Sequence, residues 1–272
     1  MNQELRIVFF GTPEFVVPVL EKLQENFEVV GVVSVGQGQA FFKKAWPFLL
    51  TPENLDQEFA KKLQELQPDL FVVASYGKII PQIILDIPKF GALNIHPSLL
   101  PKYRGPSPIQ SAILNGDKTS GISIIQMDAK IDHGPVVATK EISLSNTDTF
   151  DSLSKKMFSL GAELLVKIIP SFISGEIKPQ EQNHNQATFT KMFSKEDGYF
   201  DPAVAGQASP AFLEKLDQMI RAFYPWPTAW TKWNNKIVKF LPEGMVQMEG
   251  KKPTKLADFL HGYPTFPFRK NL

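Results

Sequence analysis

The chain has 272 residues, enough for one large domain or two, and its hydrophobic fraction of 43% allows a substantial buried core. Its 29 basic and 28 acidic side chains leave a net charge of +1, so any nucleic-acid site must be a local patch. The absence of cysteine excludes disulfides, thiolate zinc sites and cysteine nucleophiles.

The first residues lack the features of a signal peptide, and no later segment approaches the roughly 18 consecutive apolar residues that a membrane span requires. We therefore expect a cytoplasmic protein that does not bind a membrane. The segment from Arg6 to Phe10 carries a continuous apolar run, which is typical of a buried parallel strand. Thr12 and Pro13 are expected at the N-cap and in the first turn of the following helix, and Pro18 should kink that helix.

Strand-like and helix-like segments alternate through the next 150 or so residues. Thr51-Pro52 is expected to begin a helix in which Leu55, Phe59 and Leu63 recur at helical spacing. The other expected elements are strands over 28–34, 70–75, 122–127 and 136–142 and helices over 108–115 and 150–173. This alternation predicts an α/β fold with a doubly wound, mostly parallel sheet.

Composition becomes polar near residue 176, and we expect three regions: an α/β domain over 1–178, a linker over 179–206 and a small unit over 207–272. The small unit should contain a helix that begins at Ser209-Pro210 and a hairpin that turns at Asn234-Asn235. Only about 30 residues follow the hairpin, too few for five more strands of ordinary length. Because two strands are marginally stable alone, we expect its aromatic side chains to pack against the larger domain.

An amide and an imidazole, those of Asn94 and His96, lie two residues apart at the end of an apolar run. If 92–96 is a strand, both side chains point to the same face. Asn94 could then donate a hydrogen bond to a developing oxyanion, and His96 could move a proton near neutral pH. A histidine that is buried for packing alone is the alternative interpretation.

Asp132 lies in the segment Ile131-Asp-His-Gly134, which follows a strand-like run. A carboxylate beside an imidazole fixes its tautomer and raises its affinity for a proton, so Asp132 is the candidate partner of His96. An aspartate in this setting is also a common turn residue. The sequence alone does not show that these two positions meet in space.

Together these segments, Asn94-Ile-His-Pro-Ser-Leu-Leu-Pro-Lys-Tyr-Arg-Gly105 and Ile131-Asp-His-Gly134, resemble the folate-dependent formyltransferases. Four further segments support the resemblance: Phe9–Phe15, Val73–Ile79, Thr188–Gly198 and Ile220–Pro227. The last two are similar to the tRNA-directed branch of the family. The likeness covers about residues 5–240 and implies a Rossmann-like formyltransferase domain followed by a C-terminal β-barrel. The family's barrel is longer than the residues after the hairpin allow, so we expect a small truncated C-terminal β-barrel-like domain.

The resemblance implies transfer of a formyl group from 10-formyltetrahydrofolate to the α-amine of methionyl initiator tRNA, by a monomer that needs no metal. The residues that it marks as catalytic are Asn94, His96 and Asp132. Those assigned to the folate are Tyr76, Gly77, Ser98, Leu99, Leu100 and Pro101. Those assigned to the substrate are Gly11, Thr12, Pro13, Lys43, Lys44, Arg104 and Gly105.

The chain departs from the family in its RNA-directed parts. The segment 35–46 is short, and its basic content is reduced to Lys43 and Lys44, where the family carries a longer basic loop that enters the acceptor stem. Three alternatives stay open: formylation of another amine such as an amino-sugar nucleotide, hydrolysis of the formyl-folate, and a catalytically idle RNA- or folate-binding module. The segment 222–227 favours the tRNA substrate over the first two.

Overall fold

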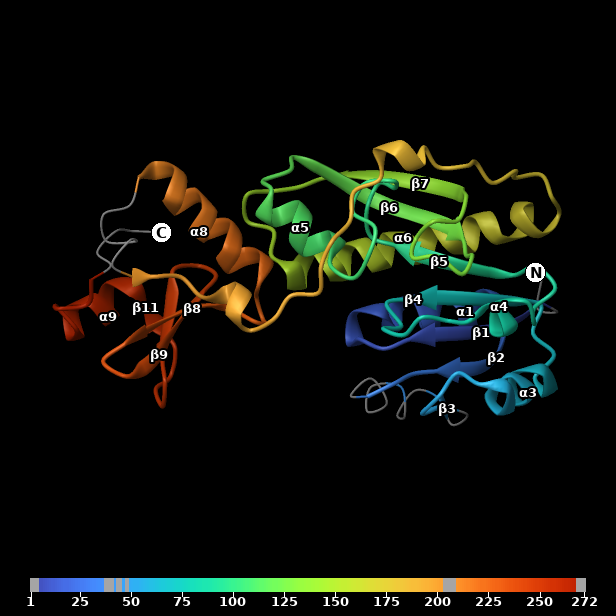
Figure 1. Cartoon of the computed structure of the whole chain (residues 1–272), viewed down its shortest axis with the longest axis horizontal. Coiled ribbons are helices and arrows are strands. Elements are labelled where there is room, and N and C mark those ends of the chain that lie inside the picture. Colours follow the sequence, from blue (N-terminus) through green and yellow to red (C-terminus); the bar gives the residue numbers. More distant parts are fainter. Residues whose placement is uncertain (1–4, 37–41, 43–45, 47–48, 203–208, 268–272) are drawn as a thin grey trace. The chain divides into compact units, whose positions relative to one another are not determined.

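A computed structural model describes residues 5–36, 42, 46, 49–202 and 209–267 (Figure 1). The chain divides into two compact units, each considered by itself. Unit 1 comprises residues 1–106, 119–143 and 154–190, and unit 2 comprises residues 107–118, 144–153 and 191–272. None of the helices in the described ranges is long and apolar enough to cross a bilayer.

Unit 1 is built on a seven-stranded sheet with the strand order β3-β2-β1-β4-β5-β6-β7. Its strands are β1 (Arg6–Gly11), β2 (Glu28–Val33), β3 (Leu49–Leu50), β4 (Leu70–Ala74), β5 (Ala92–His96), β6 (Thr119–Gln126) and β7 (Val136–Ser143). The strands β1 to β5 run parallel to one another, whereas β6 is antiparallel to both of its neighbours, β5 and β7. The predicted α/β fold with a mostly parallel sheet is therefore confirmed.

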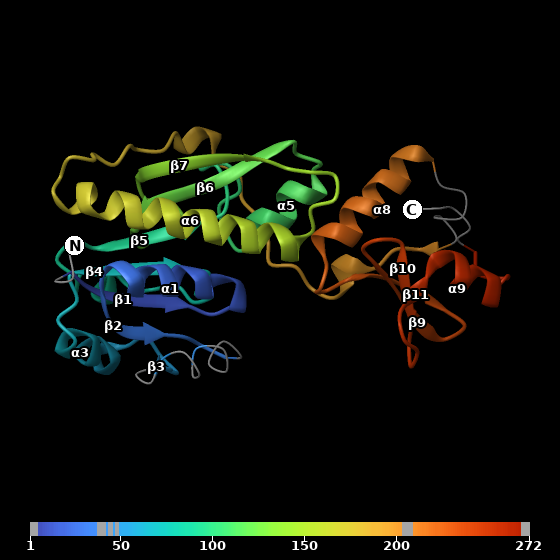
Figure 2. The same ribbon diagram turned by 180° about the vertical axis from the view of Figure 1, so that it is seen from behind.

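Helices cover both faces of this sheet, which explains why β4 and β5 are buried along their whole length. On one face, α3 (Gln57–Glu65) and α4 (Gln82–Leu85) contribute to an apolar cluster with side chains of β1, β4 and β5. On the other face lie α1 (Val17–Asn26) and α6 (Phe150–Ile173), which joins unit 1 from residue 154 onward (Figure 2). A Cβ at Gly161 of α6 would lie 2.8 Å from Ile95 of β5, so this helix packs closely on the sheet.

Two predictions about the segment after β1 are wrong. Thr12 does not cap a helix, because its hydroxyl donates a hydrogen bond to the Tyr76 carbonyl at 2.6 Å. A short 3₁₀ helix (Glu14–Val16) follows, and α1 begins at Val17. Pro18 therefore lies in the first turn of α1, where a missing N–H breaks no helical hydrogen bond and causes no kink.

The predicted start of α3 at Thr51-Pro52 is also wrong. The helix begins at Gln57, after Asp56, whose carboxylate accepts a hydrogen bond from the Phe59 amide at 3.0 Å. An aspartate in the N-cap position supplies an acceptor for one of the free amides of the first turn. The cap therefore comes from a carboxylate five positions further along the chain than predicted.

Unit 2 contains a four-stranded antiparallel sheet with the order β11-β10-β9-β8. Its elements are α5 (Pro108–Leu114), α8 (Pro210–Ala222), β8 (Ala229–Trp233), β9 (Lys236–Leu241), β10 (Met245–Met248), β11 (Thr254–Lys255) and α9 (Leu256–Gly262), with a 3₁₀ helix at Glu196–Gly198. The predicted hairpin is present: Asn234 and Asn235 have φ values of 46° and 61°, as a tight two-residue turn requires. Ser209 caps α8 as expected.

The small unit has a hydrophobic core of its own. The two strands β10 and β11 and the helix α9 extend the predicted hairpin, and side chains of α8, α9 and the sheet meet around Phe240 and Phe266. The prediction of a unit built on one helix and one hairpin is therefore incomplete, because the last 30 or so residues contribute strands that their short apolar runs did not reveal.

Candidate active site

β5 positions the two polar side chains on which the predicted site depends. Asn94 and His96 are 9% and 4% exposed, and they alternate along the strand with Ile95, which packs against α6 on the opposite face. Both polar side chains therefore point to the face away from α6, as the two-residue period of a strand requires.

Asp132 lies in the loop between β6 and β7 and contacts both of these side chains. Its Oδ1 is 3.4 Å from the Asn94 Nδ2 and 3.4 Å from the His96 Nδ1. Its Oδ2 accepts a hydrogen bond of 2.7 Å from the main-chain amide of Gly105. Asp132 thus contacts both of the side chains with which it was predicted to act, although it comes from a segment far from them in the sequence.

The ring of His96 is held at both nitrogens. Its Nε2 is 2.9 Å from the carbonyl oxygen of Tyr103, and because a carbonyl can only accept, Nε2 carries a hydrogen. The other nitrogen, Nδ1, faces the Asp132 carboxylate. A doubly protonated ring donates to both partners, whereas the neutral tautomer with its hydrogen on Nε2 turns the Nδ1 lone pair toward the carboxylate.

The loop after β5 buries the hydroxyl of Ser98. Ser98 is fully buried, and its Oγ donates to the Lys102 carbonyl at 2.6 Å while its carbonyl accepts from the Ser123 hydroxyl at 2.7 Å. Ser98 therefore shapes the loop rather than presenting a polar group to a ligand. The next three residues, Leu99, Leu100 and Pro101, keep partly exposed surface.

Arg104, a predicted substrate residue, is 3% exposed and makes internal contacts. Its guanidinium donates to the Gln182 Oε1 at 2.6 and 3.2 Å and to the His184 Nδ1 at 2.8 Å. Gln182 in turn donates from Nε2 to the carbonyls of Asp132, at 2.9 Å, and Gly134, at 2.7 Å. Gln182 was not predicted as a site residue, since it lies in a polar segment with no periodic pattern.

The remaining predicted residues lie at the carboxyl ends of β1 and β4, which run parallel to β5, so these ends share one edge of the sheet. Gly11 ends β1, followed by Thr12 and Pro13, and Gly77 has a φ of 86° two residues after a Ser75 that is also left-handed. The Tyr76 ring belongs to the apolar cluster under α3 and α4, so only its main chain faces this edge. Lys43 and Lys44 lie outside the described residues.

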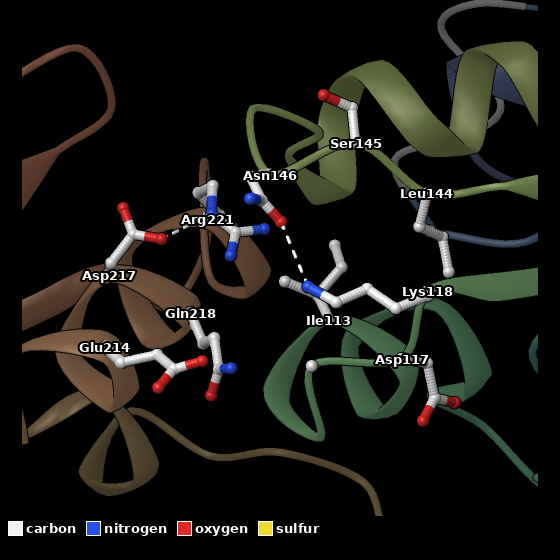
Figure 3. Close-up of a pocket in the computed structure, with 11 residues that line it drawn as sticks. Ile113, Asp117, Lys118, Leu144, Ser145, Asn146, Glu214, Asp217, Gln218 and Arg221 are labelled. Atoms are coloured by element: carbon white, nitrogen blue, oxygen red, sulfur yellow. Dashed lines mark hydrogen bonds and ion pairs between the residues drawn. The ribbon is translucent and has the colours of Figure 1, made fainter. Parts of the chain in front are cut away.

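A cavity of about 160 Å³ lies within unit 2, and none of its lining residues was predicted as a site residue (Figure 3). Three of its charged groups have partners: Lys118 donates to the Asn146 side chain at 3.3 Å, and Arg221 pairs with Asp217 at 2.8 Å. In the described part of the chain, no three His, Asp or Glu side chains form a group that could hold a metal ion.

Known proteins resemble this chain in both of its parts. Residues 5–169 match the formyl transferase family, and residues 212–243 match the formyl transferase C-terminal domain. A methionyl-tRNA formyltransferase from Roseiflexus castenholzii is 41% identical over 254 residues, covering 87% of this chain and 79% of that protein. One from Chloroflexus aurantiacus is 38% identical over 262 residues, covering 90% of this chain and 82% of that protein.

Solved structures share the fold. A methionyl-tRNA formyltransferase from Clostridium thermocellum aligns with a TM-score of 0.62 and 21% identity, covering 92% of this chain and 96% of that one. HypX from Aquifex aeolicus in complex with tetrahydrofolic acid aligns with a TM-score of 0.71 and 17% identity, covering 98% of this chain and 49% of that one. At these identities the likeness concerns architecture.

Proposed function

We propose a function for this chain, which belongs to the formyl transferase family. It transfers the formyl group of 10-formyltetrahydrofolate to the α-amino group of methionyl initiator tRNA. The relatives with 41% and 38% identity are both methionyl-tRNA formyltransferases and are matched over most of their length. On this proposal the enzyme acts in the cytoplasm, in the initiation of protein synthesis.

One observation carries the proposal at the level of chemistry: a single carboxylate oxygen of Asp132 lies 3.4 Å from both the Asn94 amide and the His96 ring. Formyl transfer to an amine places negative charge on the formyl oxygen and requires a proton to leave the amine. A hydrogen-bond donor and an imidazole, both buried and both held by one anion, suit these two requirements.

The residues around this group also suit a folate co-substrate, which supplies an activated formyl group. Ile131, next to Asp132, is 54% exposed, and Leu99 and Leu100 are partly exposed, so apolar surface is available beside the buried polar group. A flat heteroaromatic ring system gains most of its binding energy from such surface, with a few polar groups fixing its orientation. We assign Leu99, Leu100, Pro101 and the main chain of Tyr76 and Gly77 to this co-substrate.

The proposed mechanism uses positioning and electrostatics. As the amine attacks the formyl carbon, the Asn94 Nδ2 donates a hydrogen bond to the developing oxyanion, which a protonated His96 also stabilises. His96, directly or through a water molecule, passes the proton that the amine loses to the folate nitrogen, which leaves as its bond to the formyl carbon breaks. Asp132 holds the imidazole in position and balances its charge.

Further parts of the proposal concern the RNA. We assign residues 1–178 to the chemistry, 179–206 to a connection and 207–272 to tRNA binding, with Lys43 and Lys44 as further phosphate contacts. The match of residues 212–243 to the formyl transferase C-terminal domain supports this assignment. A monomer suffices, because one chain supplies all three members of the polar group.

The alternatives differ in the acceptor. An amino-sugar nucleotide or water could take the place of the amino acid at the same polar group, but neither explains the segment 220–227 or the C-terminal match. An idle binding module does not require the arrangement of Asn94, His96 and Asp132.

The test offers the purified protein a formyl donor with a labelled formyl carbon, together with one of three acceptors: charged initiator tRNA, an amino-sugar nucleotide, or water alone. We expect the label to appear on the methionine of the tRNA, at a rate proportional to the enzyme concentration. Lys61→Ala, which changes an exposed side chain of α3, is the control and should behave as the wild type. Label in the sugar alone, or release of labelled formate alone, would contradict the proposal.

A further inference from the structure

The Gln182 side chain uses both ends of its amide to join two loops. Its oxygen accepts two hydrogen bonds from Arg104, and its nitrogen donates to the carbonyls of Asp132 and Gly134. Because a guanidinium only donates and a carbonyl only accepts, the orientation of the amide is unambiguous. At 7% exposure the amide has little access to water, so these four contacts satisfy it.

We propose that Gln182 is a positioning residue for Asp132: its amide N–H groups fix the loop that presents the carboxylate to Asn94 and His96. This inference rests on the proposed function of that group. Gln182 touches no reacting atom and acts through Asp132.

The loop 131–134 needs such a fixing contact. Asp132 has a φ of 48°, in the left-handed region that non-glycine residues rarely occupy. Gly134 passes so close to β6 that a Cβ there would lie 1.8 Å from the Gln126 carbonyl oxygen. A backbone held in an unusual conformation persists when its surroundings determine it, and Gln182 binds a carbonyl on each side of the turn.

The other end of the amide is firmly anchored. The Arg104 main chain pairs with the strand-like segment that follows Gln182, through the Arg104 amide to the Thr188 carbonyl at 2.8 Å and the Thr190 amide to the Arg104 carbonyl at 2.7 Å. His184 accepts a further hydrogen bond from the guanidinium. The Arg104 side chain is therefore a fixed base from which Gln182 reaches the Asp132 loop.

Two variants separate the ends of the amide. Gln182→Glu keeps an acceptor for Arg104 but replaces the N–H donors by an oxygen that faces two carbonyls. Gln182→Met has the same length and offers Arg104 no strong acceptor and the carbonyls no donor. Gln186→Glu and Gln186→Met are matched controls, since Gln186 is an exposed glutamine of the same segment. The measurements are kcat and KM for both substrates, Tm, and the ¹⁵N signals of the His96 ring in ¹⁵N-histidine protein.

We expect both Gln182 variants to lose kcat by a similar factor, up to about 100-fold, because a misplacement of about 1 Å in a catalytic group has that effect. KM should be unchanged. Asp132→Asn serves as the reference variant, and the His96 ring signals of both Gln182 variants should move in the same direction as in that variant. Tm should fall in Gln182→Met more than in Gln182→Glu, which keeps the Arg104 contact.

A packing role predicts the opposite: kcat follows Tm, with Gln182→Glu near the wild type, and the His96 signals stay in place in both variants. Either result would overturn the inference. A wild-type protein that fails to formylate tRNA would refute the proposed function. The ring signals do not require turnover, so they would still test the role of Gln182 in that case.

Discussion

The family resemblance assigned Tyr76 to folate binding, but its side chain belongs to the core of unit 1. Its ring lies 5.3 Å from that of Phe10 in an edge-to-face arrangement, and its buried hydroxyl has no hydrogen-bond partner among the described residues. Burial disfavours the phenolate and raises the pKa of Tyr76 to about 12. The hydroxyl is therefore a group whose ionisation opposes folding.

Stability at high pH tests this assignment. The pKa of tyrosine in an unfolded chain is about 10, so below that pH both states keep the proton and Tyr76 adds no pH dependence. Between about pH 10 and 12 the unfolded state loses the proton first, and the free energy of unfolding falls as the pH rises. Tyr76→Phe should match the wild type at pH 8 and fall less steeply from pH 10 to 12 in urea titrations, with an unchanged KM for the folate. Parallel pH curves for the two proteins would contradict the burial of this hydroxyl.

At the scale of elements, the regular parts of unit 1 could be predicted from the sequence. Burial in the core requires apolar side chains at regular spacing, and this spacing is visible in β1, β4, β5 and the helix 150–173. The predicted bounds of these elements therefore agree with the structure within a residue or so. The shared face of Asn94 and His96 follows from the same strand period. Helix starts were less predictable: Thr12 and Asp56 are both plausible caps, and tertiary hydrogen bonding decides between such residues.

The irregular segments could not be predicted, because what holds them is a set of side-chain hydrogen bonds rather than a pattern. Nothing in the spacing of Asp132 from His96 shows that the loop after β6 returns to β5. The polar segment around Gln182 resembles a solvated linker, since one buried amide among exposed neighbours leaves no periodic signal. A glutamine and an arginine that satisfy each other can be buried at low cost, which hydrophobicity alone does not reveal.

At the scale of the whole molecule, the near-zero net charge limits how the chain can hold RNA. Each phosphate contact adds about 0.7 to 0.9 to the magnitude of the slope of log affinity against log salt concentration. With a short basic segment we expect a shallow slope for tRNA. Replacing Lys43 and Lys44 together by alanine should reduce its magnitude by about 1.4 to 1.8, if both contact phosphates. Filter-binding titrations measure this slope, and Lys61→Ala with Lys62→Ala on α3 is the control pair. An unchanged slope in the Lys43/Lys44 variant would show that recognition lies elsewhere.

The central claim, that the group of Asn94, His96 and Asp132 carries out formyl transfer to methionyl initiator tRNA, is tested most directly by one rate. The measurement is the single-turnover rate of label transfer from the formyl donor to that tRNA, for the wild type and for His96→Ala, with folding checked by circular dichroism. Loss of one donor to a developing oxyanion typically costs about 10²- to 10³-fold in rate, and His96→Ala should lose at least that much. A folded His96→Ala protein that transfers the formyl group at a near-normal rate would contradict the account.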